Sequence, residues 1–379
     1  MVIRHTLALC GLSAAVGLLA WCGPFWLLPV ALLMPACWAA ASSRWQAGLV
    51  VLVYHLAASN GLPYGAATYF GRPVLGVMLW LGAALILAVT WALLWHSKPK
   101  IRTYLLPVAL LLVAVPPIGI VGWVHPITAA GCLFPGCGWY GLAVTFALIL
   151  VFAAVPLRAA LGLTAAAVGV AFVLRTPPPG IAEWEPFNTH FDCGISRDFL
   201  GDFSRIQHVK KLAAHSPARV AIFAESIGGL WTPQTLDLWQ SSRHGPFVVF
   251  GSELPIGNAD KCDNTLIALE PTGARILYRQ RMPIPVSMWR PWTGKGGYRP
   301  HWFENPVVDL DGYTVAPLIC YEEALVWPIL HSVMHHPTVL IAVANDWWAR
   351  GTTIPMMQIN CSRAWARLFS LKLEVSFNY

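Results

Sequence analysis

Charged side chains are scarce in this chain of 379 residues. They account for 11% of it, whereas hydrophobic residues account for 56%. Soluble domains usually carry about 25% charged residues, because their surfaces face water. The composition therefore excludes an ordinary soluble protein and predicts a membrane protein.

A basic cluster is also missing. The formal net charge is +7, but the Lys and Arg residues are spread along the chain without a basic run. Runs of positive charge are typical of segments that bind nucleic acid. We therefore predict no nucleic-acid site.

The nine cysteines follow no regular spacing. They fit neither a disulfide framework nor a zinc ribbon, and we predict no metal centre and no cofactor. Cys132 and Cys137 are close enough in sequence to form a disulfide or to hold a metal. Two unpaired thiols in a membrane loop are the favoured interpretation.

Long apolar segments fill the first half of the chain. A helix needs about 20 apolar residues to cross a bilayer, and on this basis residues 1–176 form a bundle of about seven transmembrane helices. The predicted segments lie near 5–22, 24–41, 45–60, 73–95, 103–124, 139–155 and 157–174. Only Gly23-Pro24 and Val155-Pro156 separate some neighbours, so the count could differ by one.

Basic residues in the short loops orient this bundle, because Lys and Arg concentrate on the cytoplasmic side. In the seven-helix arrangement only Arg72 falls on one side, and all other short-loop cations fall on the opposite side: Arg4, Arg44, Lys98, Lys100, Arg102 and Arg158. We therefore expect a multi-pass protein of a bacterial inner membrane with a cytoplasmic N-terminus. Residues 177–379 would then lie in the periplasm.

The composition becomes mixed after Pro177, and short strand-like runs alternate with turns and helix-like segments. An Asp-Gly pair at 311–312 is a favoured hairpin turn, and Thr232-Pro233 is a typical helix start. Strands are predicted at 218–224, 247–251, 264–269, 275–279, 306–310, 313–319 and 338–344, and helices from 232, at 320–334 and at 354–370. Strands that mix hairpins with helical crossovers predict an α+β layered domain.

Two reactive side chains follow predicted strands of this domain. Glu225 ends the strand at 218–224, and Cys320 lies between a strand and a helix. A helix N-terminus lowers the pKa of a cysteine, and a carboxylate beside a thiol can serve as general base. A cation near the oxyanion would complete such a site. A buried, inert cysteine is the alternative.

Four segments, in this order along the chain, resemble motifs of the nitrilase superfamily, whose enzymes use Glu, Lys and Cys. They are Ala224-Glu225-Ser226, residues 278–285, Ile319-Cys320-Tyr321-Glu322 and Asn345-Asp346-Trp347-Trp348. The apolar first half is similar to the membrane bundle of the apolipoprotein N-acyltransferase branch. Within that branch the chain looks like membrane proteins of conjugal plasmid transfer, and the resemblance covers nearly all of it.

The resemblance implies a nitrilase-like α-β-β-α sandwich after the membrane bundle. It implies that Cys320 is the nucleophile that carries an acyl group as a thioester, that Glu225 is the general base, and that Glu322 and Asn345 shape the site. It also implies a phospholipid as acyl donor and the amino group of a lipoprotein as acceptor. A component of the conjugation machinery is the other implied partner.

The chain departs from the family pattern at the lysine, which is replaced by Gln280. Arg279 and Arg281 flank it but should point to the opposite face of a strand, and Lys295 would have to reach in from a loop. Glutamine can donate a hydrogen bond to an oxyanion but carries no charge, so a rate loss of about 10²–10³ is expected.

The end of the chain departs as well. After Ser370–Tyr379 the family's closing membrane helix does not follow, so the domain looks C-terminally shortened. Two hypotheses result. The chain is a membrane-bound acyltransferase or amidohydrolase, or it is a catalytically weakened membrane scaffold that supports plasmid transfer through protein contacts.

Overall fold

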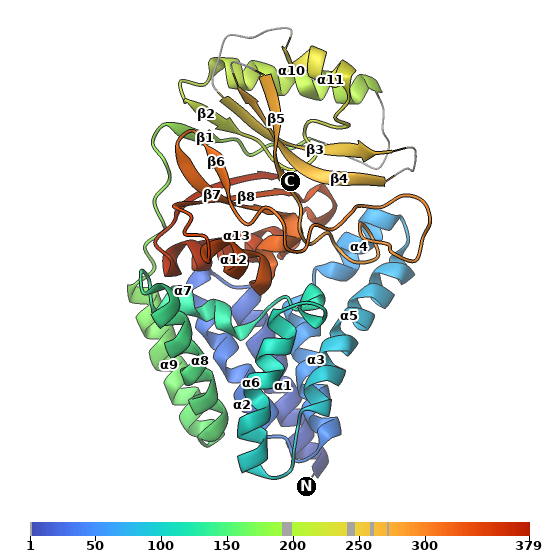
Figure 1. Ribbon diagram of the computed structural model, residues 1–379. Helices are drawn as coiled ribbons and strands as arrows, with labels where there is room; N and C mark the ends of the chain where they lie inside the picture. Colours follow the sequence, from blue (N-terminus) through green and yellow to red (C-terminus); the bar gives the residue numbers. More distant parts are fainter. Residues whose placement is uncertain (1, 192–198, 241–246, 258–260, 271–272) are drawn as a thin grey trace. The chain divides into compact units, whose positions relative to one another are not determined.

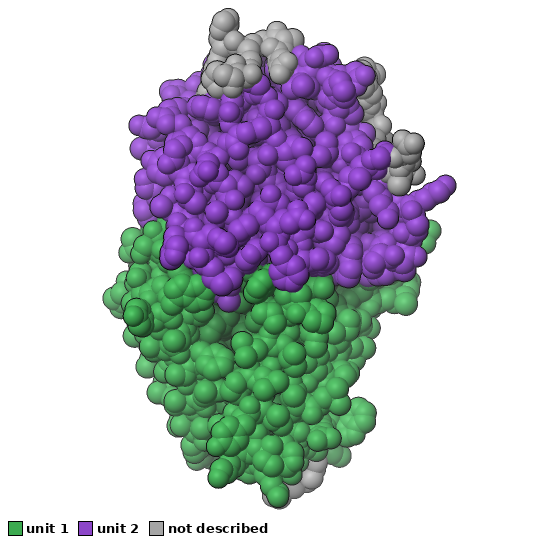
Figure 2. Space-filling model, viewed as in Figure 1, with its two compact units in different colours: residues 1–178, 324–327, 351–371 green, residues 179–323, 328–350, 372–379 purple. Residues whose placement is uncertain are grey.

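The computed structural model describes residues 2–191, 199–240, 247–257, 261–270 and 273–379 (Figure 1). The chain divides into two compact units, which Figure 2 colours separately. Unit 1 comprises residues 1–178, 324–327 and 351–371, and unit 2 comprises residues 179–323, 328–350 and 372–379. The domain boundary predicted at 176/177 lies next to the first division between the units. The sequence analysis placed residues 351–371 in the second domain, whereas here they belong to unit 1.

Unit 1 is helical. Its helices are α1 (Val2–Trp21), α2 (Leu33–Ala39), α3 (Arg44–Ala58), α4 (Leu62–Phe70), α5 (Pro73–Leu93), α6 (Pro99–Ala114), α7 (Ala130–Leu133), α8 (Gly138–Ala154), α9 (Leu157–Val173) and α13 (Ile354–Leu368). Short 3₁₀ segments lie at Phe25–Leu32, Ile118–Val121 and Pro126–Ala129. Prolines begin α5 and α6, where their missing N–H costs no helical hydrogen bond.

Tryptophans hold the interior of unit 1 together. The indole nitrogen of Trp38 donates to the carbonyl of Trp91 at 3.0 Å, and the two rings meet edge to face. Trp21 donates to the hydroxyl of Tyr54. Cys132 is buried and Cys137 exposed, and both are free thiols.

Two helices of the described chain are long and apolar enough to cross a membrane, judged by length and composition: Ile3–Trp21 in α1 and Pro73–Leu93 in α5. Shorter apolar helices lie at Phe25–Ala39, Gly138–Ala154 and Leu157–Val173. The predicted segment 103–124 is interrupted, because α6 ends before Pro116-Pro117. The seven-helix membrane bundle and its orientation stay predictions.

The first sheet of unit 2 has five strands in the order β1-β2-β3-β4-β5. The strands are β1 (Trp184–Pro186), β2 (Val220–Ile222), β3 (Phe247–Ile256), β4 (Lys261–Glu270) and β5 (Gly273–Arg279), and the helices between them are α10 (Phe199–His215) and α11 (Pro233–Gln240). β1, β2 and β3 are parallel, while β3, β4 and β5 are antiparallel. Figure 1 shows α10 and α11 covering the outer face of this sheet, where Ile206, Val209 and Trp239 pack against Phe223 and Phe250.

The second sheet has four strands in the order β6-β7-β8-β9. They are β6 (Val308–Leu310), β7 (Tyr313–Ile319), β8 (Val339–Asn345) and β9 (Lys372–Asn378), and α12 (Val326–Val333) connects β7 to β8. β6 and β7 form a hairpin, and β7, β8 and β9 are parallel. Figure 1 shows the two sheets of unit 2 as stacked layers. The predicted strands 264–269 and 275–279 pair antiparallel as parts of β4 and β5, while residues 271–272 of the turn predicted between them lie outside the described residues. The predicted hairpin at 306–319 and the strand at 338–344 are confirmed.

The turn after Glu225 depends on a glycine in β3. A Cβ on Gly251 would lie 2.4 Å from the Cα of Glu225 and 2.5 Å from the nitrogen of Ser226. The backbone of Gly251 also hydrogen-bonds Ala224 and Gly228, so β3 cannot simply move away. The small size of this residue sets the position of Glu225.

We expect Gly251→Ala to lower the free energy of unfolding by about 1–3 kcal/mol, the usual cost of forcing extra volume into a packed site. The thermal unfolding midpoint of the purified full chain measures the effect. Gly273→Ala is the matched control, because a Cβ there meets nothing within 4 Å. Equal midpoints for the two variants would contradict the close contact.

Candidate active site

Glu225 lies in the turn that follows β2. The next residue, Ser226, has a positive φ of 59°, a strained conformation for a residue with a side chain. One carboxylate oxygen of Glu225 accepts a hydrogen bond from Nδ2 of Asn264 at 2.6 Å, and the other accepts from the backbone N–H of Asn345 at 3.0 Å. The side chain is buried, and these bonds hold it in one orientation.

Cys320 directly follows β7 and begins a 3₁₀ turn over Cys320–Ala324. Its φ is 53°, so the chain turns sharply at this residue, as it does after Glu225. The buried Cys320 thiol forms a hydrogen bond with the Glu225 carboxylate. The structure thus brings together the two residues that the sequence analysis singled out as nucleophile and base.

Burial dominates the pKa values of this pair. It raises the pKa of Glu225 to about 7, although hydrogen bonds from Asn264, Asn345 and Cys320 act in the opposite direction. Burial also raises the pKa of the Cys320 thiol well above its ordinary value, and the negative charges of Glu225, Asp346 and Glu323 raise it further. The proton therefore rests on sulfur until a reaction moves it.

The expected lowering of the Cys320 pKa is wrong. It assumed a long helix starting at this residue, but the turn spans only five residues and α12 begins at Val326. A single 3₁₀ turn has a weak dipole, and burial together with three nearby carboxyl groups outweighs it. Activation of the thiol must come from proton transfer to Glu225.

Gln280, at the position of the family lysine, is buried next to this pair. Its Nε2 donates to the carbonyl of Ile319 at 3.0 Å, and its Oε1 accepts from Nδ2 of Asn264 at 2.9 Å. Asn264 therefore connects Gln280 to Glu225 through one amide group. One N–H of the Gln280 amide is left over, and it offers a neutral donor without a charge.

Arg279 and Arg281 are engaged elsewhere. Arg279 forms an ion pair with Asp263 at 3.2 Å. Arg281 is fully buried and donates to the hydroxyl of Tyr278 at 2.9 Å and to that of Ser332 at 3.0 Å. Lys295 is exposed on its loop. These side chains do not take over the place of the family lysine.

Glu322 binds donors from two separate segments. Its carboxylate accepts from the backbone N–H groups of Arg281 at 2.7 Å, Met282 at 3.0 Å and Ile319 at 2.9 Å. It also accepts from the hydroxyl of Tyr278 at 2.9 Å and 2.8 Å. Because the carboxylate is fully used in this way, Glu322 is suited to positioning Gln280 beside Cys320 rather than to proton transfer.

Asn345, the last residue of β8, acts on Glu225 through its backbone. Its side-chain Oδ1 accepts from Nδ2 of Asn378 at 2.8 Å, which ties the ends of β8 and β9 together. The strand β9 was not among the predicted strands. The alternation of Leu373, Val375 and Phe377 with polar residues was the signal for it.

Sequence reasoning missed Asn264 and Asp346 as members of the site. Asp346 is completely buried, and within the described part of the chain neither of its carboxyl oxygens has a hydrogen-bond partner. Burial, and then the charge of Glu225, raises its pKa well above the ordinary value. Asp346 lies inside the Asn-Asp-x-Trp motif, so its position was visible in the sequence. Asn264 had no comparable signal.

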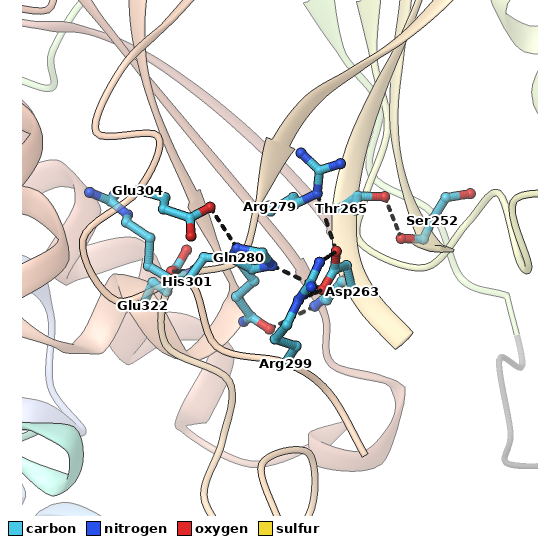
Figure 3. A network of polar contacts seen from close by, with 11 residues as sticks. Ser252, Asp263, Thr265, Arg279, Gln280, Arg299, His301, Glu304 and Glu322 are labelled. Carbon is cyan, nitrogen blue, oxygen red and sulfur yellow. Dashed lines mark hydrogen bonds and ion pairs between the residues drawn. The ribbon is translucent and has the colours of Figure 1, made fainter. Parts of the chain in front are cut away.

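A second polar cluster holds the loop after β5 against β4. Arg299 and His301 donate to the buried carboxylate of Asp263 at 2.7 Å and 2.9 Å (Figure 3). Burial raises the pKa of Asp263, but hydrogen bonds from His301 and Arg299 outweigh it and lower that pKa to about 2. Since Asp263 precedes Asn264, this cluster fixes the strand that supports Glu225.

Comparison with known proteins agrees with this geometry. Residues 256–367, which include Gln280 and Cys320, match the family model described as carbon-nitrogen hydrolase. The second half of the chain therefore carries a nitrilase-superfamily domain of the carbon-nitrogen hydrolase type.

The whole chain has relatives of nearly equal length. It is 39% identical to the conjugal transfer protein TraB of Agrobacterium fabrum over 97% of this chain and 91% of the relative. It is 38% identical to the probable conjugal transfer protein TraB of Sinorhizobium fredii over 97% and 96%. The chain belongs to the TraB family of conjugal transfer proteins.

Among solved structures, an amidase from Nesterenkonia sp. is similar to part of the chain. The match covers 52% of this chain and 74% of the amidase, with 14% sequence identity and a TM-score of 0.35.

Glu225 makes stability depend on pH. Its pKa is raised from 4.5 to about 7 in the folded protein, so the folded state binds the proton more tightly than the unfolded state. This contribution is fully present below about pH 4.5 and is lost as pH rises through about 7, on the order of 3 kcal/mol in total. The raised pKa of Asp346 makes stability depend on pH in the same direction.

We therefore expect the thermal midpoint of the native chain to fall between pH 5 and pH 8, and Glu225→Gln to reduce that fall. Glu183→Gln, which changes a carboxylate that is 64% exposed, should leave the fall unchanged. Parallel pH profiles for the native chain and Glu225→Gln would show that Glu225 does not hold its proton in the folded state.

Proposed function

We propose that this chain is a membrane-integral thiol acyltransferase or amidohydrolase that acts in conjugal plasmid transfer. Cys320 is the nucleophile, Glu225 is the general base, and Gln280 is a neutral donor near the oxyanion. Glu322 and Asn345 position these groups. The observation that carries the proposal is the buried hydrogen bond between the Cys320 thiol and the Glu225 carboxylate.

The first half-reaction loads an acyl group onto the thiol. As the sulfur attacks the carbonyl carbon, its proton passes to Glu225, whose pKa near 7 suits a base at neutral pH. The tetrahedral intermediate then expels an alcohol or an amine, which takes the proton from Glu225. The acyl group remains on Cys320 as a thioester.

The second half-reaction releases the acyl group. An acceptor amine or water attacks the thioester carbonyl and gives a proton to Glu225. The bond to sulfur breaks, and Glu225 returns the proton to Cys320, so the site regains its starting state. Membrane phospholipid is the acyl donor that the family resemblance favours, and an amino group of a lipoprotein is the acceptor.

One observation favours a second candidate, a membrane scaffold with weakened catalysis. The Gln280 amide spends its oxygen and one N–H on Asn264 and Ile319, so it can offer an oxyanion one neutral N–H and no positive charge. The three carboxyl groups near Cys320 therefore lack the family cation. In this case the protein would act as a scaffold that binds other proteins of the conjugation machinery.

The location that fits both candidates is a bacterial inner membrane, with the N-terminus in the cytoplasm and unit 2 in the periplasm. Support for this comes from the two apolar helices of membrane-crossing length and from the bias of Lys and Arg among the short loops.

Intact mass spectrometry of the purified full chain tests the proposal. After incubation with phospholipid, we expect a fatty-acyl mass increase that disappears in Cys320→Ala and is strongly reduced in Glu225→Gln. Cys137→Ala, which removes an exposed free thiol, is the control and should keep the adduct. No adduct on the native chain, together with a Cys320→Ala variant that still supports conjugation, would favour the scaffold.

Restoring the family lysine gives a second test. Gln280→Lys should speed thioester formation by about 10²–10³, because a cation then faces the developing oxyanion. Gln280→Met removes the same hydrogen bonds without adding a charge, so it should not be faster than the native chain. If Gln280→Lys folds with a native thermal midpoint and is no faster, position 280 does not serve the oxyanion.

A further inference from the structure

Unit 1 contains a cavity between the ends of two of its helices and the start of a third. It lies between the last residues of α2, the first turns of α6 and the last turn of α8, and it has a volume of about 160 Å³. A cavity needs only about 10–15 Å³ to hold one water molecule, so this one can take a group as large as a phosphate. No part of the proposed reaction uses it.

Part of the wall of this cavity is basic and part is apolar. Lys100, Arg102 and Thr103 of α6 form the basic and polar part. The apolar wall includes Trp38 from α2 and Leu150 and its neighbours from α8. A lining of this kind fits an anionic group that is attached to an apolar one.

The cations here have no acidic partner within their unit. Residues 1–178, 324–327 and 351–371 contain no aspartate and no glutamate. Trp95 brings two of these cations together to form a basic cluster. Arg44 donates to the carbonyl of Trp95 at 3.1 Å, and the guanidinium of Arg102 lies 5.6 Å from the Trp95 ring. No carboxylate of unit 1 can therefore balance the charge of these groups.

The start of α6 adds hydrogen-bond donors to this positive charge. The helix has 16 residues and begins at Pro99, and its capping residue, Lys98, forms no side-chain cap. The first N–H groups of a helix have no partner within the helix, and together with the helix dipole they favour an anion.

We propose that this cavity binds the phosphate group of an anionic phospholipid, with Lys100, Arg102 and the start of α6 on the phosphate and with Trp38 and Leu150 beside the glycerol and acyl part. The apolar wall favours a lipid over free phosphate. α5, which is long and apolar enough to cross a membrane, ends at Leu93, shortly before Trp95. A cluster at such a helix end meets lipid head groups.

The test is native mass spectrometry of the full chain in detergent, titrated with phosphatidylglycerol and with phosphatidylcholine. The native chain should prefer phosphatidylglycerol, and Lys100→Gln/Arg102→Gln should bind it roughly tenfold more weakly or worse, since each Lys or Arg near an anionic lipid surface contributes severalfold. Arg72→Gln/Arg175→Gln removes the same charge from the same unit away from the cavity and should bind almost as well as the native chain.

A variant with a filled cavity distinguishes specific binding of the lipid in the cavity from a general attraction of the lipid to positive charge. Ala154→Trp keeps every charge but occupies the space that Ala154 lines, and it should also weaken phosphatidylglycerol binding. Unchanged binding in Ala154→Trp, or equal losses in the two charge variants, would overturn the proposal. Competition with inorganic phosphate shows whether the bound phosphate group comes from a lipid or from the free ion. Weak displacement of phosphatidylglycerol by phosphate supports the lipid, whereas full displacement supports the free ion as ligand.

Discussion

The arrangement of the site depends on the buried carboxylate of Glu322. Four donors from two distant segments converge on it: the backbone at residues 281 and 282, the backbone at residue 319, and the hydroxyl of Tyr278. A buried charge is tolerated only when hydrogen bonds replace the water it has lost. Here that requirement forces the chain after β5 against the end of β7, and Gln280 and Cys320 thereby become neighbours.

The electrostatic character of the site follows from one replacement. With glutamine in place of lysine, the pair of Cys320 and Glu225 lies among further carboxyl groups, and no donor in the described residues bonds the carboxyl oxygens of Asp346. Burial and like charges both favour the neutral forms. The resting site is therefore a protonated thiol beside a carboxyl group that titrates near neutrality, and not a preformed thiolate.

The parts of the fold and of the site that could be predicted are those where the hydrophobic pattern of the sequence and a motif agreed. The strand ends that present Glu225 and Cys320 were predicted because apolar runs of five to seven residues precede both. The helix α10 and the strand β9 were missed, although Ile206, Val209 and Ala213 in the former and Leu373, Val375 and Phe377 in the latter have the proper periodicities. The pKa of Cys320 could not be predicted, because it depends on burial and on carboxyl groups that only the tertiary fold brings near.

Asn264 illustrates a second limit of the sequence. An asparagine in a strand carries no sign of function by itself, and its importance arises from two acceptors, Glu225 and Gln280, that lie 39 and 16 positions away along the chain. The polar cluster around Asp263 has the same character. Long-range hydrogen bonds of this type leave no periodic pattern in the sequence.

The path of the chain between the units has a consequence for its synthesis. The polypeptide leaves unit 2 at residue 351, adds α13 to unit 1, and returns at residue 372 to supply β9. The second sheet is therefore incomplete until β9 (Lys372–Asn378) has been made. Until β9 is added, β8 has an unpaired edge, and such an edge can pair with other chains. Cutting the gene after residue 350 would make that transient state permanent.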